Sequence, residues 1–258
     1  QGIFLRGLVS VPLLLAIAYA RKSLFIRIDR RNWKVVLVRA FSELGATMAF
    51  LTALSKMPLA NVTAILQSLP LTVTMFAAIF FGEKVGWRRW SAILIGFVGV
   101  LIIIRPGGEG FNQFSVLALI AVGFVTLRDA ITRRLDTSVP SLFVALISAV
   151  PVFLFGGGMS VATGWTPMTS VMYGTITLAG IDMTGGHLFA VMAMRKGEIS
   201  FVAPFRYTGM IWAILFGFLL FSDLPDMTTI FGTVIVVGMG IYALHREKIH
   251  QVAATPQL

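Results

Sequence analysis

The sequence has no cysteine, only three histidines and few charged residues, with acidic side chains scarcer than basic ones. Without cysteine there are no disulfides, thiolate metal sites or cysteine nucleophiles, and cysteine usage leaves the redox compartment open. Charged residues make up 12% of the chain, whereas a soluble domain carries about a quarter because it must cover its surface with them. The composition therefore excludes a water-soluble globular domain.

Apolar residues are abundant, at 57% of 258 residues, and the mean hydropathy is +0.88. They recur along the whole chain in runs of roughly 20 residues, the length that an α-helix needs to cross the hydrocarbon core of a bilayer. The short alternating segments of a transmembrane β-barrel are missing from the sequence. The predicted fold class is an all-α polytopic membrane protein, in which each helix satisfies its own backbone hydrogen bonds.

Short loops that hold most of the charge separate the apolar runs, and we expect nine membrane spans. They are Ile3–Ala20, Val35–Leu54, Leu59–Phe81, Trp90–Ile104, Phe114–Ile131, Val139–Ala162, Ser170–Met194, Ile199–Phe221 and Thr228–Leu244.

Lys and Arg are unequally shared between alternate loops. One side holds only Lys56 and Arg105. The other holds Arg21, Lys22, Arg27, Arg30, Arg31, Lys34, Lys84, Arg88, Arg89, Arg133, Arg134, Arg195, Lys196, Arg246 and Lys248. The positive-inside rule assigns the second side, and the C-terminus with it, to the cytoplasm. The net charge of +10 then indicates a basic cytoplasmic face rather than nucleic-acid binding.

The chain contains an internal repeat. A shift of 140 residues, without gaps, lays Gly45–Leu101 over Gly185–Ile241 and aligns Lys56 with Lys196. Other aligned pairs are Gly45 with Gly185, Ala53 with Ala193, Val62 with Val202, Phe76 with Phe216, Phe81 with Phe221, and Glu83 with Asp223. Because Lys56 and Lys196 fall on opposite sides of the membrane, the two copies have opposite orientation, a recurring plan of secondary transporters.

The repeat also predicts the domain organisation. We expect an N-terminal repeat over residues 1–107 with four visible helices, a C-terminal repeat over 108–248 with five, and a cytoplasmic tail over 249–258. Nine spans place Gln1 outside, so we expect one further helix before it, which makes two inverted five-helix repeats.

Sequence motifs support a family resemblance. Leu66-Gln67-Ser68-Leu69-Pro70 is followed by Phe80-Phe81-Gly82-Glu83-Lys84-Val85, and then by Trp90 through Gly96, Gly99, Ile102 and Arg105-Pro106. These residues resemble the drug/metabolite transporter superfamily, in particular its EamA-like ten-helix members. The second half is similar more loosely, with Asp223 where the family often has Glu. The resemblance implies alternating access and transport of metabolites such as amino acids, nucleobases or vitamins. The sequence departs from the family in its first helix.

Polar residues inside the apolar spans are candidates for a binding site, because a charge in hydrocarbon costs at least about 2.5 kcal/mol and normally faces a partner or an aqueous cavity. Under the repeat, Gln67 aligns with Tyr207, and Asp182 aligns with Ser42, the neighbour of Glu43. Polar groups therefore recur at equivalent depths, where a midplane site is expected. The predicted substrate-binding residues are Glu43, Gln67, Asp182, His187, Arg206, Tyr207 and, as a further candidate, Trp212.

These side chains suggest roles, and each role has a structural alternative. Arg206 would hold a substrate carboxylate or phosphate, and Glu43 or Asp182 would bind an amine or carry a coupling proton. Arg39 and Glu43 are equally well spaced as an i,i+4 ion pair that holds helices together. Asp182 and Arg206 could neutralise each other.

The remaining candidates are more readily read as packing or interface residues. His187 is more often a packing residue than a proton carrier, and Trp212 faces lipid or packs by default. Arg128, with Asp129 beside it, is expected to reach the cytoplasmic headgroups.

The sequence therefore predicts a secondary transporter for a small polar organic metabolite in a bacterial inner membrane. Protons are a candidate coupling ion, and no cofactor, metal or nucleic-acid partner is expected. A multidrug or cation exporter of the same fold and a non-transporting membrane partner subunit remain alternatives. An intramembrane enzyme is disfavoured, because the three histidines show no spacing of a metal site.

Overall fold

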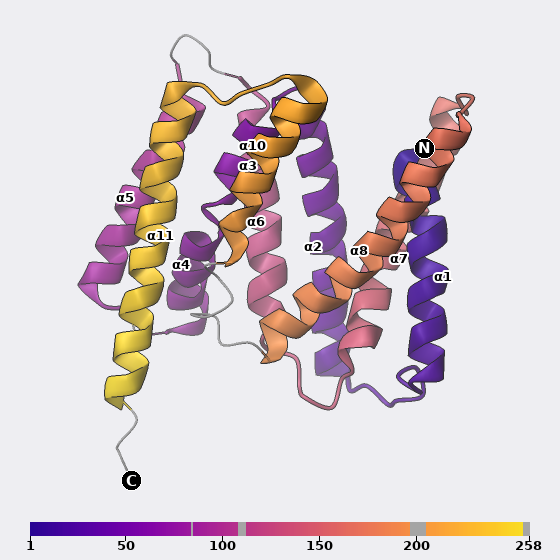
Figure 1. The fold of residues 1–258 in the computed structure, drawn as a ribbon. Coiled ribbons are helices and arrows are strands. Elements are labelled where there is room, and N and C mark those ends of the chain that lie inside the picture. Colours follow the sequence, from indigo (N-terminus) through magenta and orange to yellow (C-terminus); the bar gives the residue numbers. More distant parts are fainter. Residues whose placement is uncertain (84, 108–111, 197–204, 255–258) are drawn as a thin grey trace. The chain divides into compact units, whose positions relative to one another are not determined.

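The computed structural model describes residues 1–83, 85–107, 112–196 and 205–254. For residues 196 and 247–254 it describes the backbone only. All regular elements of these ranges are helices (Figure 1). They are α1 (Gly2–Ala20), α2 (Arg30–Leu54), α3 (Leu59–Leu66), α4 (Leu69–Phe81), α5 (Trp87–Ile104), α6 (Ser115–Thr132), α7 (Ser141–Thr163), α8 (Ser170–Lys196), α10 (Thr208–Phe221) and α11 (Met227–Ala254).

The predicted all-α polytopic membrane fold is confirmed. Within the described ranges, eight segments are long and apolar enough to cross a membrane, with Leu59–Phe81 counted as one, and α10 is a shorter apolar helix. Helix ends agree with the predicted spans to within a few residues, except that α2 begins earlier and α11 ends later than their apolar runs. Of the predicted span Ile199–Phe221, residues 199–204 lie outside the described residues.

The helices pack into two compact units. The first unit comprises Gln1–Gly45 and Ile131–Lys196, and the second comprises Ala46–Ala130 and Gly197–Leu258. Each unit therefore takes a segment from both predicted repeats. Under the repeat shift, residues 1–45 correspond to 141–185, so the first unit joins a segment of one repeat to its own counterpart in the other.

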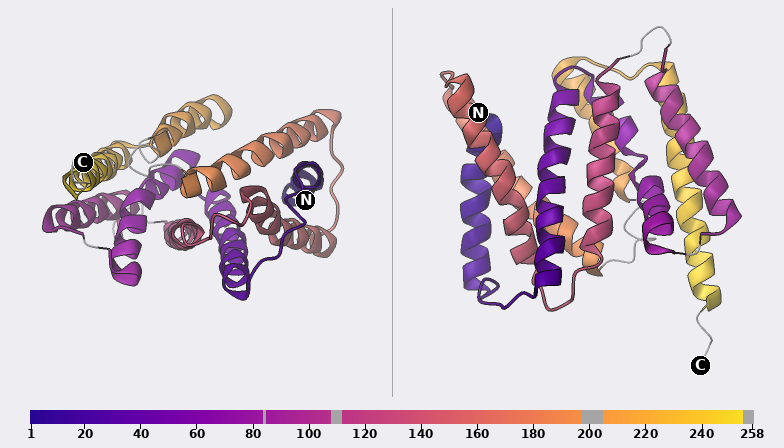
Figure 2. Two further views of the ribbon diagram at one scale, coloured as in Figure 1. Left: turned by 90° about the horizontal axis from the view of Figure 1, so that it is seen from below. Right: turned by 180° about the vertical axis from the view of Figure 1, so that it is seen from behind.

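In the first unit, α1 packs antiparallel against α7, its repeat counterpart (Figures 1 and 2). Gly7 lies against the side chain of Phe153, and Gly156 lies against Phe4. The rings of Phe4 and Phe153 stack with centroids 5.2 Å apart. The buried core of this unit includes Leu14 on α1, along with Val36, Val144 and Val191 on α2, α7 and α8.

In the second unit, α5 and α11 are likewise repeat counterparts and run side by side (Figure 1). A Cβ added to Gly99 would lie 2.9 Å from the carbonyl oxygen of Gly232, and one added to Gly232 would lie 2.7 Å from the carbonyl oxygen of Gly99. Only glycine allows two helix backbones to approach this closely, as small residues do in membrane helix pairs.

The contacts of this pair follow the repeat. A Cβ at Gly96 would lie 3.6 Å from Cβ of Met239, and a Cβ at Gly99 would lie 3.0 Å from Cγ2 of Val236. The repeat shift carries Gly96 onto Val236 and Gly99 onto Met239, so these two contacts are copies of each other with the helices exchanged. Such reciprocity indicates a pseudo-twofold axis between α5 and α11, as inverted repeats require.

The predicted third span is broken into α3 and α4 at Gln67 and Ser68. At the break, the Ser68 amide donates to the carbonyl of Ile65, three residues back. Pro70 has no N–H and its ring crowds the carbonyl of Leu66, which explains why the regular hydrogen-bond ladder stops here. In the second repeat, Tyr207 stands at the same position and precedes α10.

Polar contacts join the start of α2 to the segment between α6 and α7. Asp29 accepts hydrogen bonds from the backbone amides of Arg31 and Asn32 and from the Asn32 side chain. These bonds, that of the Asn32 side chain first, hold the pKa of Asp29 below its usual range. Asn32 also donates to the Asp136 carboxylate at 2.6 Å.

The close contact of α5 and α11 makes a prediction. Gly232→Ala should destabilise the protein by about 1–3 kcal/mol, because the added methyl meets backbone atoms of α5 that have no room to move. Gly238→Ala on the same helix is the matched control, since nothing lies within 4 Å of its Cβ position, and it should be neutral or stabilise by up to about 1 kcal/mol. Thermal unfolding in detergent measures both, and equal melting temperatures would contradict the packing.

Candidate functional site

A buried cluster of charges lies within the first unit, where α2 meets α7 and α8. Nη1 of Arg39 lies 3.9 Å from Oε2 of Glu43, one turn further along α2. Nε of Arg39 donates to the hydroxyl of Thr132 at 2.9 Å, and Nη1 donates to the hydroxyl of Ser148. Nε2 of His187, on α8, lies 3.7 Å from the same Glu43 oxygen. Glu43 thus lies between two basic side chains.

This arrangement is suited to proton exchange. Arg39 and Glu43 are only 3% and 6% exposed, so their charges balance each other in a region that is poor in water. A cavity of about 20 Å³ adjoins His187 and is lined by Arg6 and Ser10 of α1, among others. That volume suffices for about one water molecule. His187 is therefore a group that could pass a proton between this cavity and Glu43.

A second buried cluster lies within the second unit, centred on Asp129 of α6. Asp129 is 2% exposed. Its Oδ1 accepts from Nε of Arg128 at 2.9 Å and its Oδ2 accepts from Nη2 of Arg206 at 2.7 Å. One turn earlier on α6, the hydroxyl of Thr126 lies 2.6 Å from that of Thr72 on α4. The Asp129 carboxylate thus contacts two guanidinium groups, one from its own helix and one from the segment before α10.

Gln67, at the break between α3 and α4, contacts Tyr207, the residue that precedes α10. Nε2 of Gln67 donates to the main-chain carbonyl of Tyr207 at 3.1 Å, and the Met210 amide donates to the same carbonyl. Because the two residues are equivalent under the repeat, their contact places both near the pseudo-twofold axis. The Tyr207 ring lies over Gly240, where any Cβ would collide with the phenol oxygen.

Comparison with known proteins bears on the family. Residues 2–105 match the model of the EamA-like transporter family. The matched residues are those of the first repeat, which carry the broken helix and α5. This part of the chain is therefore similar to EamA-like transporters.

Curated relatives of this chain carry transporter names. It is 26% identical over 201 residues to an S-adenosylmethionine uptake transporter of Rickettsia bellii, which covers 76% of this chain and 67% of the relative. It is 25% identical over 229 residues to the pseudopaline exporter CntI of Pseudomonas aeruginosa, covering 86% and 78%. It is 23% identical over 215 residues to a riboflavin transporter of Rhizobium johnstonii, covering 83% and 71%.

The extent of these matches is partial. Several S-adenosylmethionine uptake transporters of Rickettsia are matched over 65% of their own length, about two thirds of those relatives. A solved crystal structure superposes with a TM-score of 0.66 over 95% of this chain and 87% of its own, at 17% sequence identity. That likeness supports the fold alone.

The predicted site residues are divided between the two units. Glu43, Asp182 and His187 lie in the first unit, and there Glu43 and His187 come together whereas Asp182 is exposed on α8. In the second unit, Gln67 contacts Tyr207, with Arg206 adjacent in the chain. Trp212 is 55% exposed and stacks on Phe216. A single cavity lined by all seven residues stays a prediction.

Sequence reasoning missed the role of Asp129. The Arg128–Asp129 pair was expected at the headgroups, but the structure buries Asp129 and adds Arg206 from a segment 77 residues away. The one available signal was an acidic residue inside an apolar run of a chain poor in acid.

Among the residues that the structure describes, no group of three or more His, Asp or Glu is placed to hold a metal ion.

The Asp129 cluster makes the next prediction. Asp129→Asn should destabilise the protein by about 3–5 kcal/mol, because it removes the buried negative charge that accepts hydrogen bonds from both Arg128 and Arg206. Asp226→Asn is the matched control: Asp226 also pairs with an arginine, Arg105, but both side chains are substantially exposed, so at most about 1 kcal/mol is at stake. Asn also preserves the helix cap that Asp226 forms on α11. Unfolding of both variants in detergent tests this, and similar losses would contradict a buried Asp129.

Proposed function

We propose that this chain is a secondary transporter that carries a small polar organic metabolite across a bacterial inner membrane by alternating access. The observation that best supports it is the contact of Gln67, at the break between α3 and α4, with Tyr207, its equivalent under the repeat. Broken helices at the interface of inverted repeats build the midplane sites of secondary transporters, because the break frees backbone groups for a ligand. Transport fits the names of the relatives, and we expect no enzymatic activity.

The charges favour a substrate with an anionic group. The Arg206 side chain is 27% exposed, so a substrate carboxylate or phosphate could share its guanidinium with Asp129 or displace Asp129. A cation exporter of the same fold would instead need acidic residues without this arginine. Amino acids, nucleobases and vitamins form the candidate panel, to which the relatives add S-adenosylmethionine and riboflavin.

The Glu43–His187 pair is our candidate for proton coupling. Protonation of His187 would give Glu43 a second cation beside Arg39, so the protonation states of the two groups are linked. Substrate and proton would then act through different clusters. The charge distribution over the loops supports a cytoplasmic C-terminus.

Transport into liposomes tests the proposal. The full chain is reconstituted and pooled radiolabelled amino acids, nucleobases, vitamins and S-adenosylmethionine are offered with and without a pH gradient. Arg206→Gln and Glu43→Gln should lower the initial rate about 10- to 100-fold, since each removes a charged hydrogen-bonding group worth about 1.5–3 kcal/mol. Asp226→Asn, a loop carboxylate, should transport like the wild type.

Three outcomes decide between the alternatives. Undiminished transport by folded Arg206→Gln and Glu43→Gln would make both charges structural and contradict the site. A rate that ignores the pH gradient would contradict proton coupling. Asp182→Asn, run alongside, decides whether this exposed carboxylate belongs to the site, as the repeat predicts, or only lies on the surface of α8.

A further inference from the structure

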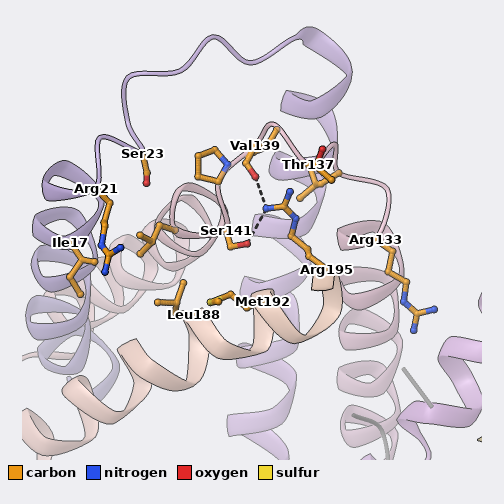
Figure 3. A pocket seen from close by; sticks show the side chains of 13 residues that line it. Ile17, Arg21, Ser23, Arg133, Thr137, Val139, Ser141, Leu188, Met192 and Arg195 are labelled. Atoms are coloured by element: carbon orange, nitrogen blue, oxygen red, sulfur yellow. Dashed lines mark hydrogen bonds between the residues drawn. The ribbon is translucent and has the colours of Figure 1, made fainter. Parts of the chain in front are cut away.

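A cavity of about 570 Å³ lies entirely within the first unit (Figure 3). It is formed where the C-terminal ends of α1 and α8 meet the segment between α6 and α7, all on the basic side of the chain. Its volume falls within the range of small-molecule binding sites, about 300–1,000 Å³. We call it the basic pocket, because Arg21, Arg133 and Arg195 line it and no described lining residue is acidic.

Two arginines lie on opposite sides of the basic pocket. Figure 3 shows Arg21 beside Ile17 on one side and Arg195 on the other, with Leu188 and Met192 between them. Arg21 extends from the end of α1 and is exposed. Arg195 belongs to the last turn of α8. Two guanidinium groups from different helices thus line one cavity. Charges on the solvent-exposed face of a single helix would not converge in this way.

The hydrogen bonds of Arg195 leave its charge uncompensated. It donates to the carbonyl oxygens of Asp136 at 2.6 Å and Val139 at 2.5 Å, and to the hydroxyl of Ser141 at 3.0 Å. All three acceptors are neutral, and the carboxylate of Asp136 is occupied by Asn32. The bonds fix the guanidinium in place at the pocket wall, while its charge has no counter-ion among the described residues. Such a preorganised arginine is suited to bind an anion.

The floor of the basic pocket is apolar. Ile17, Leu188 and Met192 are partly buried and project from α1 and α8 between the two arginines. A small inorganic anion would leave this surface uncovered, whereas an amphiphile would cover it. The pocket also lies at the cytoplasmic ends of predicted spans, the level at which lipid headgroups lie. Basic pockets between helices on this side of a membrane commonly bind anionic headgroups.

We propose that the basic pocket binds the phosphate group of an anionic amphiphile, with the phosphate between Arg21 and Arg195 and the apolar part on Ile17, Leu188 and Met192. A phospholipid and a soluble phosphate ester share this chemistry, and the apolar floor favours the phospholipid. The inference is independent of the proposed transport function, because the pocket shares no lining residue with either charged cluster.

Binding of fluorescent phosphatidylglycerol to the purified full chain in neutral detergent tests the proposal, with fluorescent phosphatidylcholine as the zwitterionic comparison. Arg21→Gln should raise the Kd for phosphatidylglycerol about five-fold, the effect of one Arg near a headgroup. Arg27→Gln is the matched control, since Arg27 is exposed on the same side but outside the pocket, and it should leave the Kd unchanged. Equal Kd values for these two variants, or equal binding of the two lipids by the wild type, would overturn the proposal.

Two further measurements identify the ligand. Leu188→Trp fills the floor and should weaken phosphatidylglycerol binding if the ligand is a lipid; Met192→Trp replaces it if the first variant melts earlier than the wild type. Glycerol 3-phosphate is the soluble competitor. If it displaces the lipid at millimolar concentration and its own binding survives Leu188→Trp but not Arg21→Gln, the same phosphate site serves a soluble ester.

Discussion

Hydrocarbon provides no hydrogen-bond partner, so every buried charge of this chain must find its counter-ion within the protein. The chain is poor in acidic residues, and in each compact unit one buried carboxylate lies between two basic side chains: Glu43 between Arg39 and His187, and Asp129 between Arg128 and Arg206. These clusters link helices that are distant in sequence. In the proposed function these clusters also receive the substrate and the proton, because Arg206 and His187 each lie against a carboxylate that a ligand or a proton would share.

The hydrocarbon of the bilayer also determines how the helices pack against each other. Lipid chains are as apolar as leucine, so helices associate through close van der Waals contact rather than by escaping water. The contact of α5 with α11 meets this condition through Gly99 and Gly232, whose backbones touch. Because these helices are counterparts in an inverted repeat, one favourable contact surface occurs twice, related by the pseudo-twofold axis. Gln67 and Tyr207 lie near that axis, where the Gln67 side chain donates to the Tyr207 carbonyl.

The basic pocket differs from the two buried clusters in how the charge of its arginine is compensated. Arg195 donates to three neutral oxygens, which do not compensate its positive charge. Arg206 donates to the Asp129 carboxylate, which does compensate its charge. The difference follows from position: near the headgroups an uncompensated guanidinium is tolerated because water and anionic lipid solvate it, whereas inside a span it is costly. A transporter and a lipid site can therefore coexist in one small chain without sharing residues.

Apolar run length by itself determined the fold class and the helix positions, because the thickness of a bilayer imposes a length that a sequence displays directly. The 140-residue repeat also aligned Gln67 with Tyr207 from the sequence alone, whereas the break of the predicted span Leu59–Phe81 at Gln67 and Ser68 was seen only in the structure. Only the tertiary structure decided which charged side chains pair with each other. Asp129 and Arg206 are 77 residues apart, and composition does not tell whether an aspartate in an apolar run is buried, as Asp129 is, or exposed, as Asp182 is. That choice depends on which helix faces meet, a property of packing between distant segments that no local pattern contains.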